Sequence, residues 1–168
     1  MPLNAITLEN VEGFTGQETG VSEWTAIAQE QIDAFAEATG DHQWIHKAHH
    51  AASDGPFHGA IAHGLLVLAS ALKLAQDAGA LPQATWIICG YDKVRFRAPV
   101  RSGSRVRCRT TVLSACKVGE RTLLTVSFTM EVEGRKIPAL VADCSLLCPG
   151  IERSARQFDE GGVVVQMR

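Results

Sequence analysis

The chain has 168 residues, of which 46% are hydrophobic and 20% are charged. The length suits one domain and the composition is ordinary for a globular protein, so disordered and fibrous classes are excluded. The formal net charge is -2 and the isoelectric point is near 6.3. Because no overall positive field exists to hold a nucleic-acid backbone, we expect no nucleic acid among the partners.

Targeting signals and cysteine frameworks are not evident. The N-terminal residues carry no basic segment followed by an apolar one, so no signal peptide is predicted. The most apolar stretch, 59–74, contains His63 and Lys73 and is shorter than the ~20 residues that cross a bilayer, so we expect no membrane contact. The five cysteines are odd in number and include no Cys-x-x-Cys pair. They are interpreted as small buried residues of a protein in the reducing cytoplasm.

The first half of the chain is mainly helical in pattern. Residues 22–28 alternate and predict a short strand, and residues 29–39 have apolar side chains near helical spacing, with Gly40 placed to end the helix. Residues 61–78 predict a helix that is apolar on almost every side, which we expect to lie buried in the middle of the fold.

The second half predicts four strands, over residues 85–98, 105–118, 121–132 and 136–147. Gly103, Gly119 and Gly134 separate these runs as glycines do in hairpins. Alternating polar and apolar residues indicate one solvent-exposed face and one buried face, which is typical of an antiparallel sheet. A sheet of this kind facing one apolar helix is an α+β fold. We expect a single domain over residues 1–150 and a tail, 151–168, that the sequence leaves unassigned.

Asp41 and His46 form the first candidate for chemistry. Five positions on a helix separate two side chains by roughly 140°, so only a curled loop brings both to one reacting centre. Together a carboxylate and an imidazole can deprotonate a water and deliver a proton elsewhere. The alternative is that Asp41 caps a short helix and His46 is an ordinary surface histidine.

The histidines between residues 42 and 63 raise the question of a metal. No His-Glu-x-x-His motif is present, and no cysteine lies in the same segment. His46 and His50 would share a face only if residues 46–50 were helical. No metal site is therefore expected.

Gly64 begins the apolar helix, directly after His63. A glycine at a helix N-terminus lets a ligand approach unpaired backbone N–H groups, whose dipoles favour developing negative charge. The alternative is that Gly64 allows the helix to pack closely on the sheet.

Basic residues lie in the first predicted strand of the sheet, 85–98. Lys93, Arg95 and Arg97 alternate with other residues and are predicted to share one face. They are either a solvated sheet face or a phosphate contact for an anionic cofactor.

Four ordered blocks carry a family resemblance: residues 38–46, 55–57, 61–64 and 93–103. Through them the chain resembles the MaoC-like, R-specific enoyl-CoA hydratase family over residues 20–148, and Gln43-Trp44 is similar to its nodulation-protein-N-like branch. The resemblance implies a hot-dog fold, in which an antiparallel sheet wraps around a long central helix. It also implies a homodimer or a dimer of dimers.

The resemblance assigns roles to particular residues. The family's catalytic pair matches Asp41 and His46, and its oxyanion and substrate-binding block matches His63 and Gly64, with the Gly64 N–H as the donor. The implied activity is addition of water across the C2=C3 bond of an acyl-CoA thioester, or the reverse. Coenzyme A is then part of the substrate, and no other cofactor is expected. The cations expected to hold its phosphates are Lys93, Arg95, Arg97 and Arg105.

The chain also departs from the family pattern. Gln43-Trp44 replaces a common Asn-Pro, so the preset geometry that proline gives a loop is lost. Lys47-Ala48 replaces a common Val-Asp, so a second acid is lost and the local electrostatic field changes. These changes bear on substrate preference and catalytic strength. Because a fold does not determine a function, an acyl-CoA thioesterase and a non-catalytic acyl-CoA-binding module are the alternatives.

Overall fold

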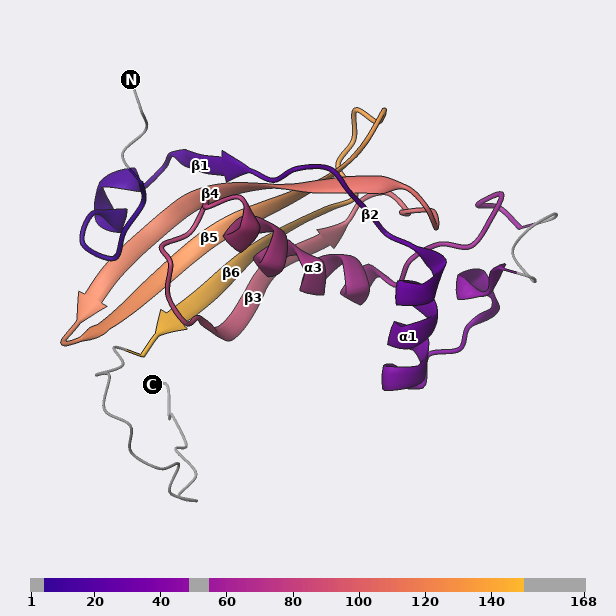
Figure 1. Cartoon of the computed structure of the whole chain (residues 1–168), viewed down its shortest axis with the longest axis horizontal. Helices are drawn as coiled ribbons and strands as arrows, with labels where there is room; N and C mark the ends of the chain where they lie inside the picture. Colours follow the sequence, from indigo (N-terminus) through magenta and orange to yellow (C-terminus); the bar gives the residue numbers. More distant parts are fainter. Residues whose placement is uncertain (1–4, 49–54, 150–168) are drawn as a thin grey trace, which may run out of the picture.

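A curved antiparallel sheet makes up most of the molecule (Figure 1). The computed structural model describes residues 5–48 and 55–149. The long strands lie in the order β4, β5, β6, β3, and the short β1 and β2 both pair with the outer side of β4. Their bounds are β1 Glu18–Val21, β2 Thr25–Ala26, β3 Ile87–Phe96, β4 Arg105–Val118, β5 Arg121–Val132 and β6 Leu140–Cys148.

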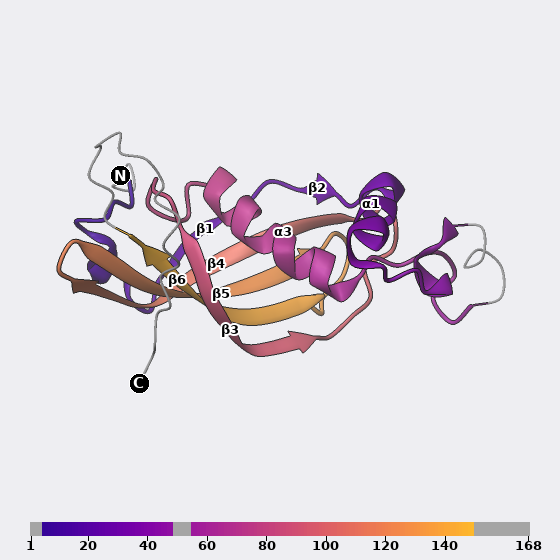
Figure 2. The same ribbon diagram turned by 90° about the horizontal axis from the view of Figure 1, so that it is seen from below.

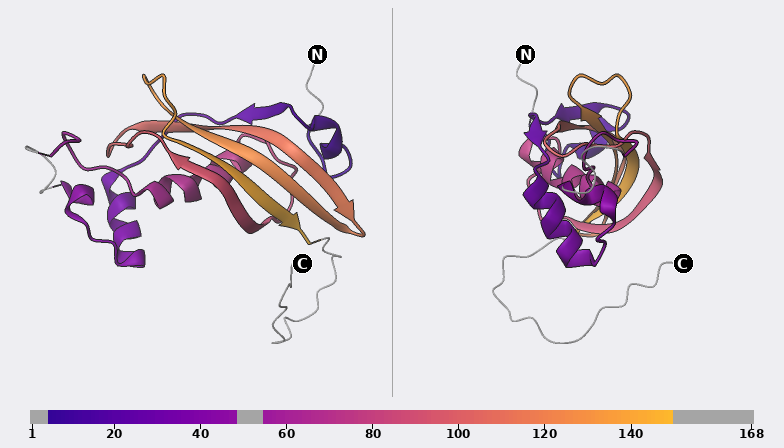
Figure 3. Two further views of the ribbon diagram at one scale, coloured as in Figure 1. Left: turned by 180° about the vertical axis from the view of Figure 1, so that it is seen from behind. Right: turned by 90° about the vertical axis from the view of Figure 1, so that its right-hand side faces the viewer.

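Helix α3 (Gly64–Asp77) lies across the concave face of this sheet, which curls around it (Figures 2 and 3). Because side chains alternate along a strand, every second residue of β5 and β6, and of β4 as far as Val112, faces the helix and is buried. The buried face of α3 consists of Val67, Leu68, Ala71, Leu74 and Ala75. This arrangement confirms the predicted α+β class and the hot-dog fold. In the described part of the chain, no helix is long and apolar enough to cross a membrane.

The remaining helices lie at the two ends of the sheet. The 3-10 helix η1 (Val11–Phe14) precedes β1, whereas α1 (Gln29–Thr39) and the 3-10 helix η2 (Trp44–His46) lie near the start of α3 (Figure 1). Helix α1 ends as predicted, because Gly40 adopts a left-handed conformation with φ 74° and its N–H donates to Ala36 O.

Several element boundaries differ from the sequence prediction, and one of them is the start of β6, which begins at Leu140 rather than at residue 136. Helix α3 begins at Gly64 rather than at residue 61, because Ile61 forms a β-bridge with Arg101 and donates its N–H to Ile45 O. Of the strand predicted over 22–28, only Thr25–Ala26 forms a strand, β2, and the sequence analysis did not predict β1 before it.

Strand β3 is irregular at Lys93. Its φ is 50°, and the pairing with β6 shifts between Asp92 and Arg95. The strict alternation predicted for this strand is therefore interrupted, as a β-bulge interrupts any two-residue repeat.

Ion pairs link three strands on the face of the sheet that points away from α3. Glu131 of β5 accepts hydrogen bonds from Arg107 Nε at 2.6 Å and from Arg109 Nε at 3.2 Å. Arg109 also binds Glu18 of β1 at 2.7 Å, and the Arg107 guanidinium lies 4.5 Å from the ring centre of Trp24. These contacts tie β1, β4 and β5 together.

The cysteines divide into two groups. Cys108, Cys144 and Cys148 are buried as predicted, and burial raises the pKa of Cys108 to about 12 and that of Cys144 to about 11. Cys89 and Cys116 are exposed, so the prediction of burial is wrong for these two. All five thiols are free.

Candidate active site

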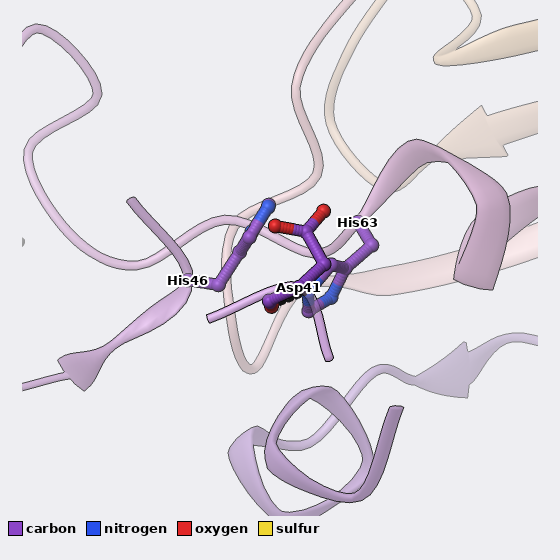
Figure 4. A group of neighbouring side chains, drawn as sticks. All are labelled: Asp41, His46 and His63. Carbon is purple, nitrogen blue, oxygen red and sulfur yellow. Dashed lines mark hydrogen bonds between the residues drawn. The ribbon is translucent and has the colours of Figure 1, made fainter. Parts of the chain in front are cut away.

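Asp41 and His46 come together through a turn between α1 and η2. The left-handed Gly40 lets the chain change direction after α1, and η2 places His46 at its last position. Potential ligand atoms of Asp41, His46 and His63 all lie within 4.8 Å of one another (Figure 4). The curled loop that the sequence analysis required is therefore present.

His46 is buried, with 6% of its surface exposed. Its Nδ1 lies 2.7 Å from Ile61 O, and because a carbonyl oxygen only accepts, Nδ1 carries a proton. This bond fixes the ring and leaves Nε2 for a reacting group. The interpretation of His46 as a surface histidine is wrong.

Asp41 presents a carboxylate that is already bound by a neighbour. Gln43 Nε2 donates to Asp41 Oδ1 at 3.0 Å, and the Gln43 backbone N–H approaches the same oxygen at 3.4 Å. The hydrogen bond from the Gln43 side chain lowers the pKa of Asp41, with smaller contributions from His46 and His63. A carboxylate with a lowered pKa is ionised at neutral pH, as a base must be.

His63 lies directly before α3 and contacts both of the other residues. Its Nε2 is 3.0 Å from Asp41 O, and its ring is stacked on that of His46 with 3.6 Å between the ring centres. Phe35 of α1 packs on it as well, at 5.0 Å. His63 is 3% exposed.

These residues line a cavity of about 560 Å³. Asp41, Gln43, His46 and His63 form its polar side, and the other walls are mostly apolar. The aromatic rings of Phe35 and Phe96 belong to these walls. A mostly apolar cavity with a few convergent polar groups is typical of a small-molecule site.

Gly64 opens α3 at the wall of this cavity. The first backbone N–H groups of a helix have no partner within it, and the Gly64 N–H donates to none of the described backbone groups, so it is available at the cavity that Asp41 and His46 also line. A Cβ at this position would lie 2.8 Å from Phe96 Cε1. Both interpretations of Gly64, a donor at a helix terminus and a close-packing residue, thus agree with the geometry.

The four cations predicted to bind phosphates differ in their surroundings. Arg97 lines the cavity. Lys93 Nζ lies 2.9 Å from Asp143, Arg105 lies 2.9 Å from Glu133, and the Arg95 guanidinium donates to Val94 O. Among these four, only Arg97 lies in the cavity wall.

The Asp41, His46 and His63 donors could also suggest a metal. A metal ion bound to two imidazoles lies near the plane of each ring, where the lone pairs point. The stacked rings of His46 and His63 lie in two nearly parallel planes, 24° apart, so their lone pairs do not converge. This geometry suits proton transfer better than metal binding. His50, which would share a face with His46 only if residues 46–50 were helical, lies outside the described residues.

Sequence reasoning assigned no role to Phe35 or Phe96. Each lies in an ordinary amphipathic pattern, and nothing in that pattern separates an aromatic residue of the core from one that lines a site. The contact between Phe96 and Gly64 joins residues 32 positions apart, so it depends on how β3 lies against α3.

Comparisons with known proteins agree with the resemblance. The family model described as "MaoC like domain" matches residues 10–134. Nodulation protein N of Rhizobium meliloti is 43% identical over 148 residues, covering 84% of this chain and 90% of that protein. The 3-hydroxyacyl-thioester dehydratase Z of Mycobacterium tuberculosis is 44% identical over 139 residues, covering 82% and 92%.

Solved structures share the fold at lower identity. The unliganded R-hydratase of Pseudomonas aeruginosa has a TM-score of 0.66 and 22% identity, covering 90% of this chain and 92% of that one. The (R)-hydratase of A. caviae has a TM-score of 0.63 and 20% identity, covering 79% and 94%. With its sheet wrapped around α3 and its Asp41 and His46 side chains on one cavity, the chain belongs to the MaoC-like domain family.

Proposed function

We propose that this protein is an R-specific 2-enoyl-CoA hydratase, which also runs in reverse as a 3-hydroxyacyl-CoA dehydratase. The observation that carries the proposal is the meeting of three groups at one cavity: the Asp41 carboxylate, the free Nε2 of His46 and the backbone N–H of Gly64. The relatives named 3-hydroxyacyl-thioester dehydratase and 3-hydroxybutyryl-CoA dehydratase support it.

Hydration begins with a water held between Asp41 and His46. The Asp41 carboxylate takes one proton from the water while the water oxygen bonds to C3 of the enoyl thioester. The π electrons of the C2=C3 bond move toward the thioester carbonyl, whose oxygen becomes enolate-like. The Gly64 N–H, at the positive end of α3, stabilises the charge on this oxygen.

Protonation of C2 completes the reaction. His46 gives its Nε2 proton to C2 and the thioester carbonyl re-forms. Because Nδ1 keeps its own proton for Ile61 O, the ring enters this step with protons on both nitrogens and leaves it with one. The proton that Nε2 gives up is the one that Asp41 took from the water and passed to Nε2 before this step, so Asp41 and His46 return to their starting state and one water has been added in total.

The phosphates of coenzyme A need a local cation, because the net charge of the chain is -2. The predicted set is Lys93, Arg95, Arg97 and Arg105. Its best-supported member is Arg97, since it lines the cavity. Lys93 and Arg105 already pair with carboxylates, which reduces the charge that they offer to a phosphate.

A homodimer or a dimer of dimers is part of the proposal. Strand β3 is an edge of the sheet, and an exposed edge is a template for pairing with a second strand. Ile87, Ile88 and Phe96 on β3 and Leu65 on α3 are large exposed hydrophobic residues. A second copy that covers them would also cover the cavity wall at Phe96. Sedimentation at micromolar concentration should give at least twice the 18.1 kDa chain mass, and a monomer would contradict the dimer.

The proposed place of the reaction is the cytoplasm, which the five free cysteines support.

The direct test is incubation with crotonyl-CoA, following the loss of enoyl absorbance and the release of free thiol together. We expect hydration without thiol release. Asp41→Asn and His46→Ala should each lower the rate at least ~10²-fold, the usual range for general acid–base groups. Wild-type rates in these variants would disprove the mechanism. Thiol release without hydration would indicate a thioesterase, and binding without turnover a non-catalytic module.

A further inference from the structure

His63 has a buried side chain that contacts both residues of the catalytic pair and Phe35 of the cavity wall. With 3% of its surface exposed, it is more enclosed than Asp41 or His46. Asp41 O can only accept a hydrogen bond, so the proton of the neutral His63 ring is on Nε2. The other nitrogen, Nδ1, is buried without a hydrogen-bond partner among the described residues. Such a buried lone pair costs free energy, so the position needs a compensating reason to keep histidine.

The two catalytic side chains differ in how firmly they are held. His46 is buried and its ring is fixed by the bond from Nδ1 to Ile61 O at 2.7 Å. Asp41 is partly exposed and follows the left-handed Gly40. Among the residues that the structure describes, only Gln43 of the same loop donates hydrogen bonds to its carboxylate. The bond from His63 Nε2 to Asp41 O joins this loop to the residue that caps α3.

We propose that His63 is a positioning residue that fixes the Asp41 base against the start of α3 through its Nε2–H bond to the Asp41 carbonyl oxygen. His63 immediately precedes Gly64, so the same contact sets the distance from the base to the oxyanion donor. The His63 ring also stacks on His46, but His46 is already fixed by its bond to Ile61 O and does not need this stack to hold its position. This role rests on the proposed hydration reaction and adds a third side chain to it.

The test uses a matched pair of variants. In His63→Gln the side-chain amide nitrogen matches the position of Nε2 and can still donate to Asp41 O. In His63→Asn the amide nitrogen matches Nδ1 and falls short of that oxygen. Both variants lose the aromatic ring and its stack, so they differ in the bond to Asp41. We expect kcat for crotonyl-CoA hydration to be at least ~10-fold higher in His63→Gln than in His63→Asn, with KM within about twofold.

A second background separates positioning from general damage to the fold. If His63 acts through Asp41, adding His63→Asn to Asp41→Asn should change the remaining kcat by less than about twofold, because the base is already absent. Equal kcat values for His63→Gln and His63→Asn would overturn the proposal. So would a further tenfold loss in the Asp41→Asn background.

Imidazole nitrogen NMR of the wild-type protein provides a readout without turnover. The spectra should place the proton of His63 on Nε2 and a proton of His46 on Nδ1, and a His63 proton on Nδ1 alone would overturn the assignment. If wild-type protein does not hydrate enoyl-CoA, the proposed function fails and this role fails with it. If wild-type protein is active and the matched variants are equal, only the role of His63 fails.

Discussion

Gln43 Nε2 donates a hydrogen bond of 3.0 Å to Asp41 Oδ1, so the base of the proposed reaction is held by a residue two positions away. At this position the family pattern commonly has asparagine, whose amide is one methylene closer to the backbone. The longer Gln43 side chain reaches back over the loop to the carboxylate. Gln43 is thus a part of the site and not only a departure from the pattern.

Replacing Gln43 by methionine should move the acid limb of the rate profile. The variant keeps the length of the side chain and loses the donor that holds the pKa of Asp41 below its ordinary value. The pKa of Asp41 should therefore rise, and kcat/KM should begin to fall at a higher pH than in wild type. At neutral pH the carboxylate stays ionised in both proteins. His42→Gln is the control, because the His42 side chain faces Glu37 instead. An acid limb that stays in place would contradict this role of Gln43.

The contact between Gly64 and Phe96 separates the two interpretations of the glycine. The three atoms nearest to a Cβ at position 64 all belong to the Phe96 ring, which is 53% exposed and free to turn. Gly64→Ala keeps its N–H but displaces this ring from the cavity wall, so KM should rise about tenfold with a stability change below ~1 kcal/mol. In a Phe96→Ala background the same change should have no further effect on KM. If Gly64→Ala still raised KM in the Phe96→Ala background, the substrate itself would need the space that glycine leaves at position 64.

The Glu131 ion pairs predict how stability depends on pH. Burial acts to raise the pKa of Glu131, but hydrogen bonds from Arg107 and Arg109 outweigh it and lower the pKa. A carboxylate whose pKa is lowered in the folded state stabilises the fold when the pH is above its ordinary pKa of 4.5. This stabilisation is lost as the pH falls through the lowered, folded-state pKa. Glu131→Gln should thus lower the free energy of unfolding by ~1 kcal/mol at pH 7, with the difference from wild type shrinking in acid.

Urea unfolding at several pH values measures this effect. Glu120→Gln is the control, because the exposed Glu120 makes no ion pair with the residues that the structure describes. A Glu131→Gln difference that stays constant down to pH 3 would argue against the ion pairs as its cause.

If Arg97 binds a phosphate of coenzyme A, its replacement should affect crotonyl-CoA but not a crotonyl thioester that lacks phosphate. Arg97→Ala should raise KM for crotonyl-CoA about tenfold and leave kcat nearly unchanged, because a charged hydrogen bond to phosphate is lost and the catalytic pair is untouched. The N-acetylcysteamine thioester of crotonate has no phosphate, so its kcat/KM should not change. Arg105→Ala is the matched control, since Arg105 is paired with Glu133. An equal fall in kcat/KM for both thioesters would exclude a phosphate contact by Arg97.

The strands, helices and turns were largely predictable because their signals are local. Gly40, Gly103, Gly119 and Gly134 all adopt positive φ, and each marks an element end that the sequence pattern indicates. The start of α3 was missed because Ile61 is held by a bridge to Arg101, a partner 40 residues away. The irregularity at Lys93 was missed as well, since an alternating sequence carries no mark of a bulge.

The site was predictable where the chain itself brings residues together. Asp41 and His46 lie on one short loop, so a curled backbone is enough to join them. His63 and Gln43 gained their roles from contacts that depend on the fold or on a side-chain conformation. The partners of the arginines depend on cross-strand register, and for this reason the sequence could not separate Arg97 from Arg105.

The loop between α1 and η2 carries both the proposed base and the proposed acid, whereas the walls around them come from α1, α3 and the segment after β3. The two proton-transfer side chains and most of the apolar cavity wall are therefore encoded in separate stretches of the chain. Substitutions at Phe35 or Phe96 can reshape the acyl site while the residues that move protons stay unchanged. Such a division allows one scaffold to evolve new thioester preferences without passing through an inactive ancestor.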